Sequence, residues 1–127
     1  MAVSPNDLLQ SAEAYSCIAK NEADYRGCIS RGYYASFHAA KKFHIGLSSP
    51  GNQLANCGEH ENLVHMLKHP TIDGANKNFV ISKEVSTYLK KMLFNRRLAD
   101  YDIDQPVSKK NVEIVFEESK LLFDSVK

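Results

Sequence analysis

The segment from Glu22 to Ile45 constrains the fold most, because it contains no proline and its apolar residues recur at helical spacing. At 100° per residue, one side of this segment collects an apolar stripe made of Ile29, Tyr33, Phe37 and Ala40. The pattern predicts one long helix, and we expect Gly46 to end it as a left-handed C-cap. A helix with one apolar face buries that face against neighbours, so the chain needs helical partners.

Four more helices are predicted from helical periodicity and from their end signals. The first begins at the Ser4-Pro5 pair and ends near Ala19, and the last begins after the N-cap Ser108. Between them, the pattern predicts a short helix that Pro70 stops and a longer helix, covering residues 59–68 and 82–98. Turn-forming residues predict loops over residues 47–58, 71–78 and 100–106. The expected fold class is therefore all-α, a small up-and-down bundle of about five helices.

The length and composition favour one domain over residues 1–127. Apolar residues make up 43% of the chain and charged residues 24%, which is an ordinary globular balance. Sixteen basic and fifteen acidic side chains give a formal net charge of +1, which excludes a strongly basic nucleic-acid coat protein. No apolar run is long enough to cross a bilayer, and the first ten residues lack the features of a secretory signal. We therefore expect a cytoplasmic protein that does not enter a membrane.

The cysteines agree with that expectation. Cys17, Cys28 and Cys57 are odd in number and show no Cys-x-x-Cys spacing, so we predict reduced thiols. Cys17 and Cys28 lie in predicted helices and are expected to act as small core residues.

A polar edge lies opposite the apolar stripe of the long helix. Arg31 and His38 are seven residues apart, nearly two whole turns, and therefore lie on one line about 10 Å apart along the axis. The small residues Gly27 and Ala35 flank this line, so a second helix can approach it closely. Two copies of the helix crossing about a two-fold axis place His38 of one chain near Arg31 of the other. We therefore expect a symmetric homodimer.

The stretch SRGYYASFHAAKKF, from Ser30 to Phe43, resembles the core motif of the HEPN superfamily, an arginine and a histidine separated by four to six residues on one helix. Further along, RRLADYD from Arg96 to Asp102 is similar to the Arg-x-x-Ala-Asp-Tyr segment of small bacterial and archaeal HEPN proteins. His60 resembles a histidine that those proteins carry at the start of the third helix. The resemblance covers most of the chain and implies an α-helical dimer.

Many HEPN proteins are metal-independent RNA endonucleases, and several are toxins that pair with a nucleotidyltransferase antitoxin. Carried over by position, Arg31 would bind the scissile phosphate and stabilise its developing charge. His38 would act as general base or general acid, a task that suits its near-neutral pKa. The resemblance thus implies an endoribonuclease of toxin–antitoxin or defence type, with RNA as substrate, and we expect no cofactor and no metal.

Further residues would complete an RNA cleft at the dimer seam. Tyr34 would hydrogen-bond the phosphate or the histidine, or stack on a base, and Lys42 would add positive charge. Arg96 would reach the same cleft or orient the segment around Tyr101. A plainer interpretation of Arg96 is an i,i+4 ion pair with Asp100.

The alternative function is a catalytically silent HEPN module that dimerises and binds RNA, a nucleotide or a nucleotidyltransferase partner. Catalytic members usually place Asn, Asp or His directly after the arginine, where this chain has Gly32. Many also carry, two residues after the histidine, a tyrosine that an antitoxin modifies with AMP, where this chain has Ala40. In this alternative, Arg31 and His38 are polar residues that line a helix contact.

One further constellation offers ligands of the type that zinc prefers. Cys57, His60, His65 and His69 supply four soft or borderline donors around the short helix, which is the number that zinc binds. The same three histidines are also suited to line an RNA groove, and His65 and His69 to stabilise the C-terminal end of the helix.

Overall fold

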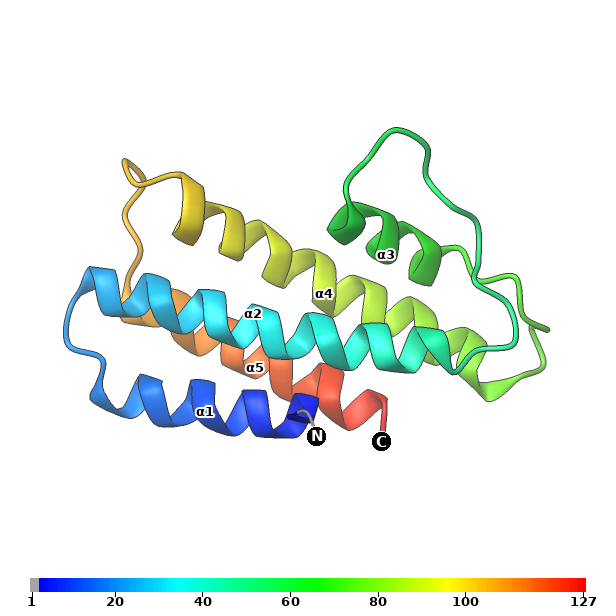
Figure 1. Ribbon diagram of the computed structural model, residues 1–127, viewed down its shortest axis with the longest axis horizontal. Helices are drawn as coiled ribbons and strands as arrows, with labels where there is room; N and C mark the ends of the chain where they lie inside the picture. Colours follow the sequence, from blue (N-terminus) through cyan, green and yellow to red (C-terminus); the bar gives the residue numbers. More distant parts are fainter. Residues whose placement is uncertain (1–2) are drawn as a thin grey trace.

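The computed structural model describes residues 3–127, which form five helices (Figure 1). In chain order these are α1 (Pro5–Ile18), α2 (Glu22–Ile45), α3 (Glu59–Lys68), α4 (Lys77–Tyr101) and α5 (Lys109–Ser125). Residues 3–127 contain no strand, and none of their helices is long and apolar enough to span a membrane. The all-α fold class predicted from the sequence is confirmed.

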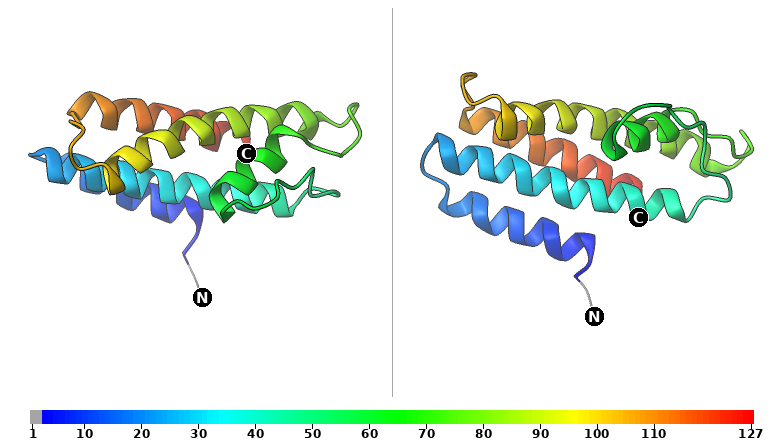
Figure 2. Two further views of the ribbon diagram at one scale, coloured as in Figure 1. Left: turned by 90° about the horizontal axis from the view of Figure 1, so that it is seen from above. Right: turned by 45° about the horizontal axis from the view of Figure 1, so that its top comes forward.

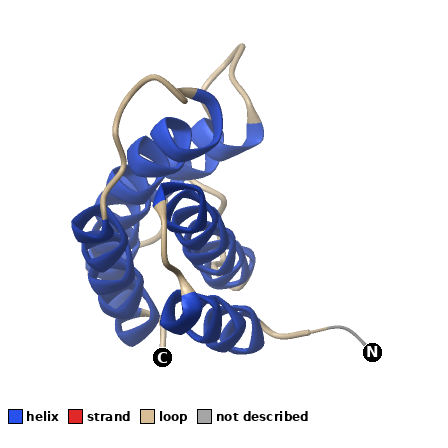
Figure 3. Cartoon of the chain, turned by 90° about the vertical axis from the view of Figure 1, so that its left-hand side faces the viewer, coloured by secondary structure: helices blue, strands red, loops and turns tan. Residues whose placement is uncertain are grey.

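The centre of the bundle is formed by α2, α4 and α5, and the other two helices pack on its outside (Figure 2). Helix α1 lies along α2, whereas α3 lies mainly against α4 and touches α2 only lightly. The four longer helices follow one another in alternating directions, with α3 inserted in the long connection between α2 and α4 (Figure 1). Figure 3 shows the same bundle viewed from one end. Helices and the loops that join them make up all of the described residues.

The core is built from the predicted apolar stripes. Ile29 and Tyr33 of α2 are 1% and 2% exposed, and Leu89 of α4 and Leu122 of α5 are fully buried against them. Burial of each such side chain stabilises the fold by about 1.5–3 kcal/mol. Four serines are buried in the same region, and each of their hydroxyls has a hydrogen-bond partner: Ser36, Ser82, Ser86 and Ser119.

The start of α4 corrects one prediction. The helix begins at Lys77, inside the segment predicted as a loop, and not at Ser82. Asn76 caps it, since the Asn76 side chain accepts a hydrogen bond of 2.9 Å from the backbone N–H of Asn78. Asn76 and Asn78, two polar residues of the segment predicted as a loop, therefore form the N-terminus of the helix.

The end of α4 corrects a second prediction. The helix continues to Tyr101, beyond the predicted end at Leu98, and shortens the acidic connection. Arg26 of α2 reaches this end, and its guanidinium donates to the carbonyls of Leu98, Ala99 and Asp102 at 2.8, 3.2 and 3.1 Å. Arg26 thus satisfies carbonyls at the end of α4 that would otherwise lack a partner, and this stabilises the longer helix.

Two further expectations were wrong. Gly46 follows α2 but has a right-handed conformation, with φ −75° and ψ −9°, because the chain continues past it as a helical turn in which the N–H of Leu47 donates to the His44 carbonyl at 3.1 Å. Cys17 is exposed, since α1 packs on one side only, whereas Cys28 is fully buried as predicted.

Candidate functional site

The outer edge of α2 carries the residues that the sequence singled out. Arg31 and Tyr34 are exposed, and His38 is half-buried, while the stripe residues on the other side of the helix are buried. The ring of Tyr34 meets the ring of His38 edge-on, with 4.4 Å between the ring centroids. The predicted division of this helix into a core face and a polar edge is therefore confirmed.

The small residues beside this edge are covered by the chain itself, which corrects one expectation. Ala35 is fully buried, and a Cβ atom on Gly27 would lie 3.1 Å from the hydroxyl of Tyr15 on α1. The helix that approaches Gly27 is therefore α1 of the same chain. Arg31 takes part in this contact, because its guanidinium carbon lies 4.0 Å from the centre of the Tyr15 ring and its Nη1 donates to the Gly27 carbonyl at 3.3 Å.

A cavity of about 320 Å³ opens between α2, α3 and α4. We call it the α2–α3–α4 groove, and its lining residues are Ser30, Tyr33, Tyr34, Phe37, His38, Lys41, Glu59, His60 and Arg96. The groove brings together three of the predicted site residues, His38, Tyr34 and Arg96. Arg31 lies outside it, in a separate hollow between α1 and α2 that it shares with Ser30 and Tyr34.

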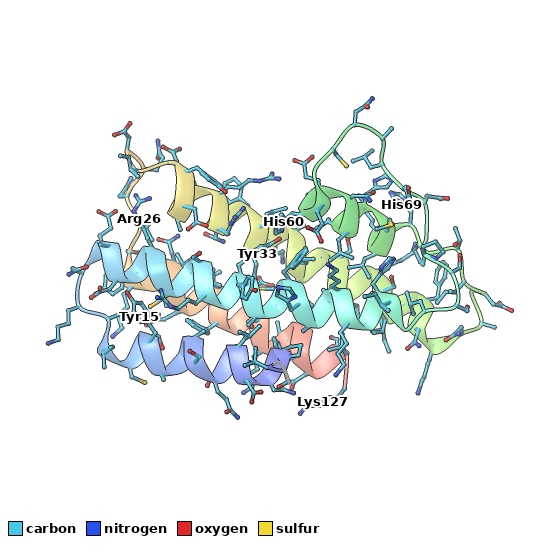
Figure 4. The ribbon with its side chains drawn as sticks, in the orientation of Figure 1. Tyr15, Arg26, Tyr33, His60, His69 and Lys127 are labelled. Atoms are coloured by element: carbon cyan, nitrogen blue, oxygen red, sulfur yellow. The ribbon has the colours of Figure 1, made fainter. Side chains whose placement is uncertain are left out.

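Tyr33 and His60 meet at the groove (Figure 4). The hydroxyl oxygen of Tyr33 lies 2.6 Å from Nδ1 of His60, and the His60 ring packs against the Phe37 ring at a tilt of 41°, with 4.4 Å between the ring centroids. Burial raises the pKa of the Tyr33 phenol, while burial and the Arg96 guanidinium lower the pKa of His60. The helical pattern assigns Tyr33 to the core and cannot show that its hydroxyl reaches a residue on another helix.

Arg96 faces the groove and is held in place by its own helix. Its Nε donates to Oδ2 of Asp100 at 2.9 Å, which confirms the predicted i,i+4 pair. Its guanidinium carbon lies 5.7 Å from the ring centre of Tyr33 and 5.0 Å from that of Tyr101. Tyr101 itself is 70% exposed at the end of α4. Arg96 therefore lies between Tyr33, at the groove, and this exposed ring.

The lysines of α2 lie on both sides of His38. Lys41 forms an ion pair of 2.9 Å with Glu59, and this contact lowers the pKa of the Glu59 carboxyl. Lys42 is exposed and lines a second, more apolar hollow of about 400 Å³, together with His38, Ile45 and residues near the start of α1. Neither lysine lines the hollow that holds Arg31.

The four residues considered as an alternative zinc site do not come together. His60 pairs with Tyr33, and Cys57 donates to a neighbouring backbone carbonyl at 3.3 Å. The rings of His65 and His69 pack against each other at a tilt, with 4.4 Å between their centroids. Five residues of helix rotate His65 by about 140° from His60, which directs the two rings to different faces of α3. No group of three or more His, Cys, Asp or Glu residues in the described chain is arranged to hold a metal ion. The zinc interpretation is therefore wrong, and His65 and His69 do not line the groove.

Comparisons of this chain with protein-family models, with curated proteins and with solved structures find no match.

Proposed function

We propose that this protein is a dimeric, metal-independent endoribonuclease of the HEPN type, from the toxin–antitoxin or defence class. The observation that carries the proposal is the position of His38, a half-buried imidazole that lines the α2–α3–α4 groove with Tyr34 packed against it. The cations Lys41 and Arg96 line the same groove. An imidazole for proton transfer, cations for phosphate and an exposed aromatic ring for a base suit cleavage of single-stranded RNA.

The proposed reaction uses the 2′-hydroxyl of the RNA as the nucleophile. The 2′-oxygen attacks phosphorus, so a P–O2′ bond forms while the P–O5′ bond breaks, which leaves a 2′,3′-cyclic phosphate and a 5′-hydroxyl. His38 of one protomer accepts the proton of the 2′-hydroxyl, and His38 of the second protomer donates a proton to the leaving 5′-oxygen. Arg31 and Arg96 stabilise the charge that develops on the phosphoryl oxygens.

A homodimer is part of the proposal because Arg31 and His38 of one chain line different hollows. A second copy packed across the outer edge of α2 would bring the guanidinium of one chain to the imidazole of the other. The apolar hollow beside His38 supports such a contact, since the large apolar residues Val3, Tyr34 and Ile45 there are 63%, 54% and 72% exposed.

The resemblance also leads us to propose a nucleotidyltransferase-type antitoxin as the partner and the cytoplasm as the location. Ala40 occupies the position of the tyrosine that such a partner modifies in other members, and it is fully buried. We therefore expect a partner to neutralise this chain by binding it.

A second candidate function, the silent HEPN module, is favoured by the surroundings of Gly32. This glycine is buried against α5, where an added Cβ would lie 3.4 Å from Val115 and 3.6 Å from Phe116. The position faces the core, so it offers the outer edge of α2 no polar group of the kind that catalytic members carry there. A silent module would dimerise and bind RNA, a nucleotide or a nucleotidyltransferase without cutting RNA.

The test is cleavage of end-labelled single-stranded RNA by the purified protein and three variants. We expect His38→Ala to reduce the rate at least about a hundredfold and Arg31→Ala to reduce it by about the same factor. His69→Ala is the matched control, because His69 is an exposed histidine outside the groove, and we expect it to keep the wild-type rate. EDTA should leave the rate unchanged.

Cleavage that survives His38→Ala would contradict the proposal and indicate a contaminating nuclease or another site. A wild-type protein that binds RNA and sediments as a dimer but cuts no RNA would support the silent module instead. Circular dichroism of each variant shows whether its fold is retained.

A further inference from the structure

The hydroxyl of Tyr33 has one hydrogen-bond partner in the described chain. Tyr33 is 2% exposed, and the atom within reach of its hydroxyl is Nδ1 of His60, at 2.6 Å. A buried phenol hydrogen without an acceptor costs about 1–3 kcal/mol, so this hydrogen is directed at Nδ1. A nitrogen that accepts a hydrogen bond carries no proton, and neutral His60 therefore holds its proton on Nε2.

The other side of the His60 ring is available to a ligand. In residues 3–127, Nε2 of His60 forms no hydrogen bond, although the ring is half-buried and lines the groove. Arg96 is in a similar position, because Asp100 engages its Nε while its two terminal nitrogens have no hydrogen-bond partner among residues 3–127. The groove is thus lined by a neutral N–H donor from His60 and by the charged guanidinium of Arg96.

The charges around His60 keep the imidazole neutral and the groove positive. Facing it are Glu59 on α3, His38 and Lys41 on α2, and Arg96 and Arg97 on α4. Glu59, which pairs with Lys41, opposes this by raising the pKa of His60, but its effect is smaller than those of burial and of Arg96. Burial, followed by the Arg96 guanidinium, lowers the pKa of His60 from its usual value of 6.5.

We propose that His60, as a neutral imidazole, donates its Nε2–H to a phosphate oxygen of the RNA and that Tyr33 is the positioning residue that fixes this tautomer. The guanidinium of Arg96 supplies the charge at the same phosphate. The inference rests on the proposed function for the identity of the ligand. It adds a phosphate-binding residue from α3 and a positioning residue from the core to the pair Arg31 and His38.

The first part of the test is the tautomer, measured by two-bond ¹H–¹⁵N correlation spectra of the histidine rings in the full chain. We expect the wild type to show the Nε2–H form of His60 at neutral pH. Tyr33→Phe removes only the hydroxyl, and we expect a mixture of both tautomers. Tyr88→Phe is the control, because Tyr88 is a half-buried tyrosine outside the groove, and its spectrum should match the wild type.

The second part is binding of a short single-stranded RNA in which every 2′-hydroxyl is methylated, so that it cannot be cut. We expect His60→Ala to weaken binding about tenfold, which is the loss of one hydrogen bond to a charged group. His60→Gln retains an N–H at a similar reach and should recover much of the affinity. Tyr33→Phe should weaken binding less than His60→Ala, and its affinity should rise as the pH falls, because the ring is then free to take a second proton.

The outcomes separate the inference from the proposed function. A His60 ring in the Nδ1–H form, or binding that His60→Ala leaves unchanged, overturns the inference while cleavage by His38 stands. A wild-type protein that does not bind the methylated RNA overturns the inference and the proposed function together. The expected tautomer combined with the tenfold loss in His60→Ala supports the inference.

Discussion

Tyr33 belongs to the core and to the groove at once. Its ring is 2% exposed inside the bundle, and its hydroxyl ends at His60, whose ring lines the groove. A substitution at this position therefore has two separable effects. Loss of the whole ring leaves a cavity that destabilises the protein by about 3–5 kcal/mol, whereas loss of the hydroxyl alone leaves the packing intact.

His60 makes the stability of the fold depend on pH. Burial and Arg96 lower its pKa in the folded protein, so the unfolded chain takes up a proton first as the pH falls below 6.5. Stability contributed by neutral His60 is complete at higher pH and is lost progressively on acidification below that value. Glu59 does not interfere, since the pKa of its carboxyl is lowered from 4.5 and it stays ionised over this range.

We predict that the wild type loses more thermal stability than His60→Gln between about pH 8 and about pH 5.5, because only the wild type must bury a ring that prefers to be charged. Melting curves followed by circular dichroism at both pH values measure the difference. Equal losses in the two proteins would mean that His60 titrates in the folded chain as it does in the unfolded one.

At the scale of the elements, Arg26 ties α2 to the end of α4. Its side chain is 13% exposed, and its two terminal nitrogens donate to backbone carbonyls at and beyond the C-terminus of α4, those of Leu98, Ala99, Asp102, Ile103 and Gln105. The C-terminal carbonyls of a helix lack intrahelical partners and carry partial negative charge. A planar guanidinium can serve several of them together, and a lysine ammonium on a single stem cannot.

Arg26→Lys should therefore destabilise the protein by about 2 kcal/mol, and the last turn of α4 should fray. The matched control is Arg97→Lys, which changes an exposed arginine paired with Glu61 at 2.8 Å and should cost less than about 1 kcal/mol. Urea unfolding measures both values, and a cost for Arg26→Lys no larger than that of the control would show that the contacts of Arg26 with the end of α4 do not stabilise the fold.

The position of His60 depends on how α3 is attached to α4. Ser82 and Ser86 of α4 donate hydrogen bonds of 2.7 Å to the carbonyls of Leu67 and Val64 on α3. Both hydroxyls are buried, and α3 has only light contact with α2. These two hydrogen bonds fix α3 on α4, and this attachment determines the position of His60 relative to Tyr33.

At the scale of the whole molecule, the proposed dimer depends on the outer edge of α2. The hollow beside His38 is lined by apolar residues from α1 and α2, and Ile45 at its end is 72% exposed. An apolar surface of this kind is stabilised when a second copy covers it.

If the proposed dimer forms, Ile45→Asp should shift it to monomer and lower RNA cleavage in parallel, because in the proposal a second copy completes the site. Ile103→Asp is the control, since Ile103 is 78% exposed in the connection after α4 and lies outside this hollow. Sedimentation equilibrium distinguishes the 14.3 kDa chain from a species of twice that mass. A wild type that is monomeric at all concentrations would contradict the dimer.

The number of helices, the buried face of α2 and the pair between Arg96 and Asp100 were all predictable from the sequence. These features depend on spacings of three, four or seven residues along one helix, and helix geometry alone converts such spacings into a face. The capping signal at Ser4 likewise acts within one turn, which is why the start of α1 agrees with its prediction.

Other features depended on which helices lie side by side. The contact of Tyr33 with His60, the cover of Gly27 by Tyr15 and the extension of α4 under Arg26 each join residues of different helices. The exposure of Cys17 has the same origin, since α1 has a neighbour on one side only. Local periodicity specifies the apolar face of each helix but not the helix that covers it or their relative register, and the tertiary packing alone decides both.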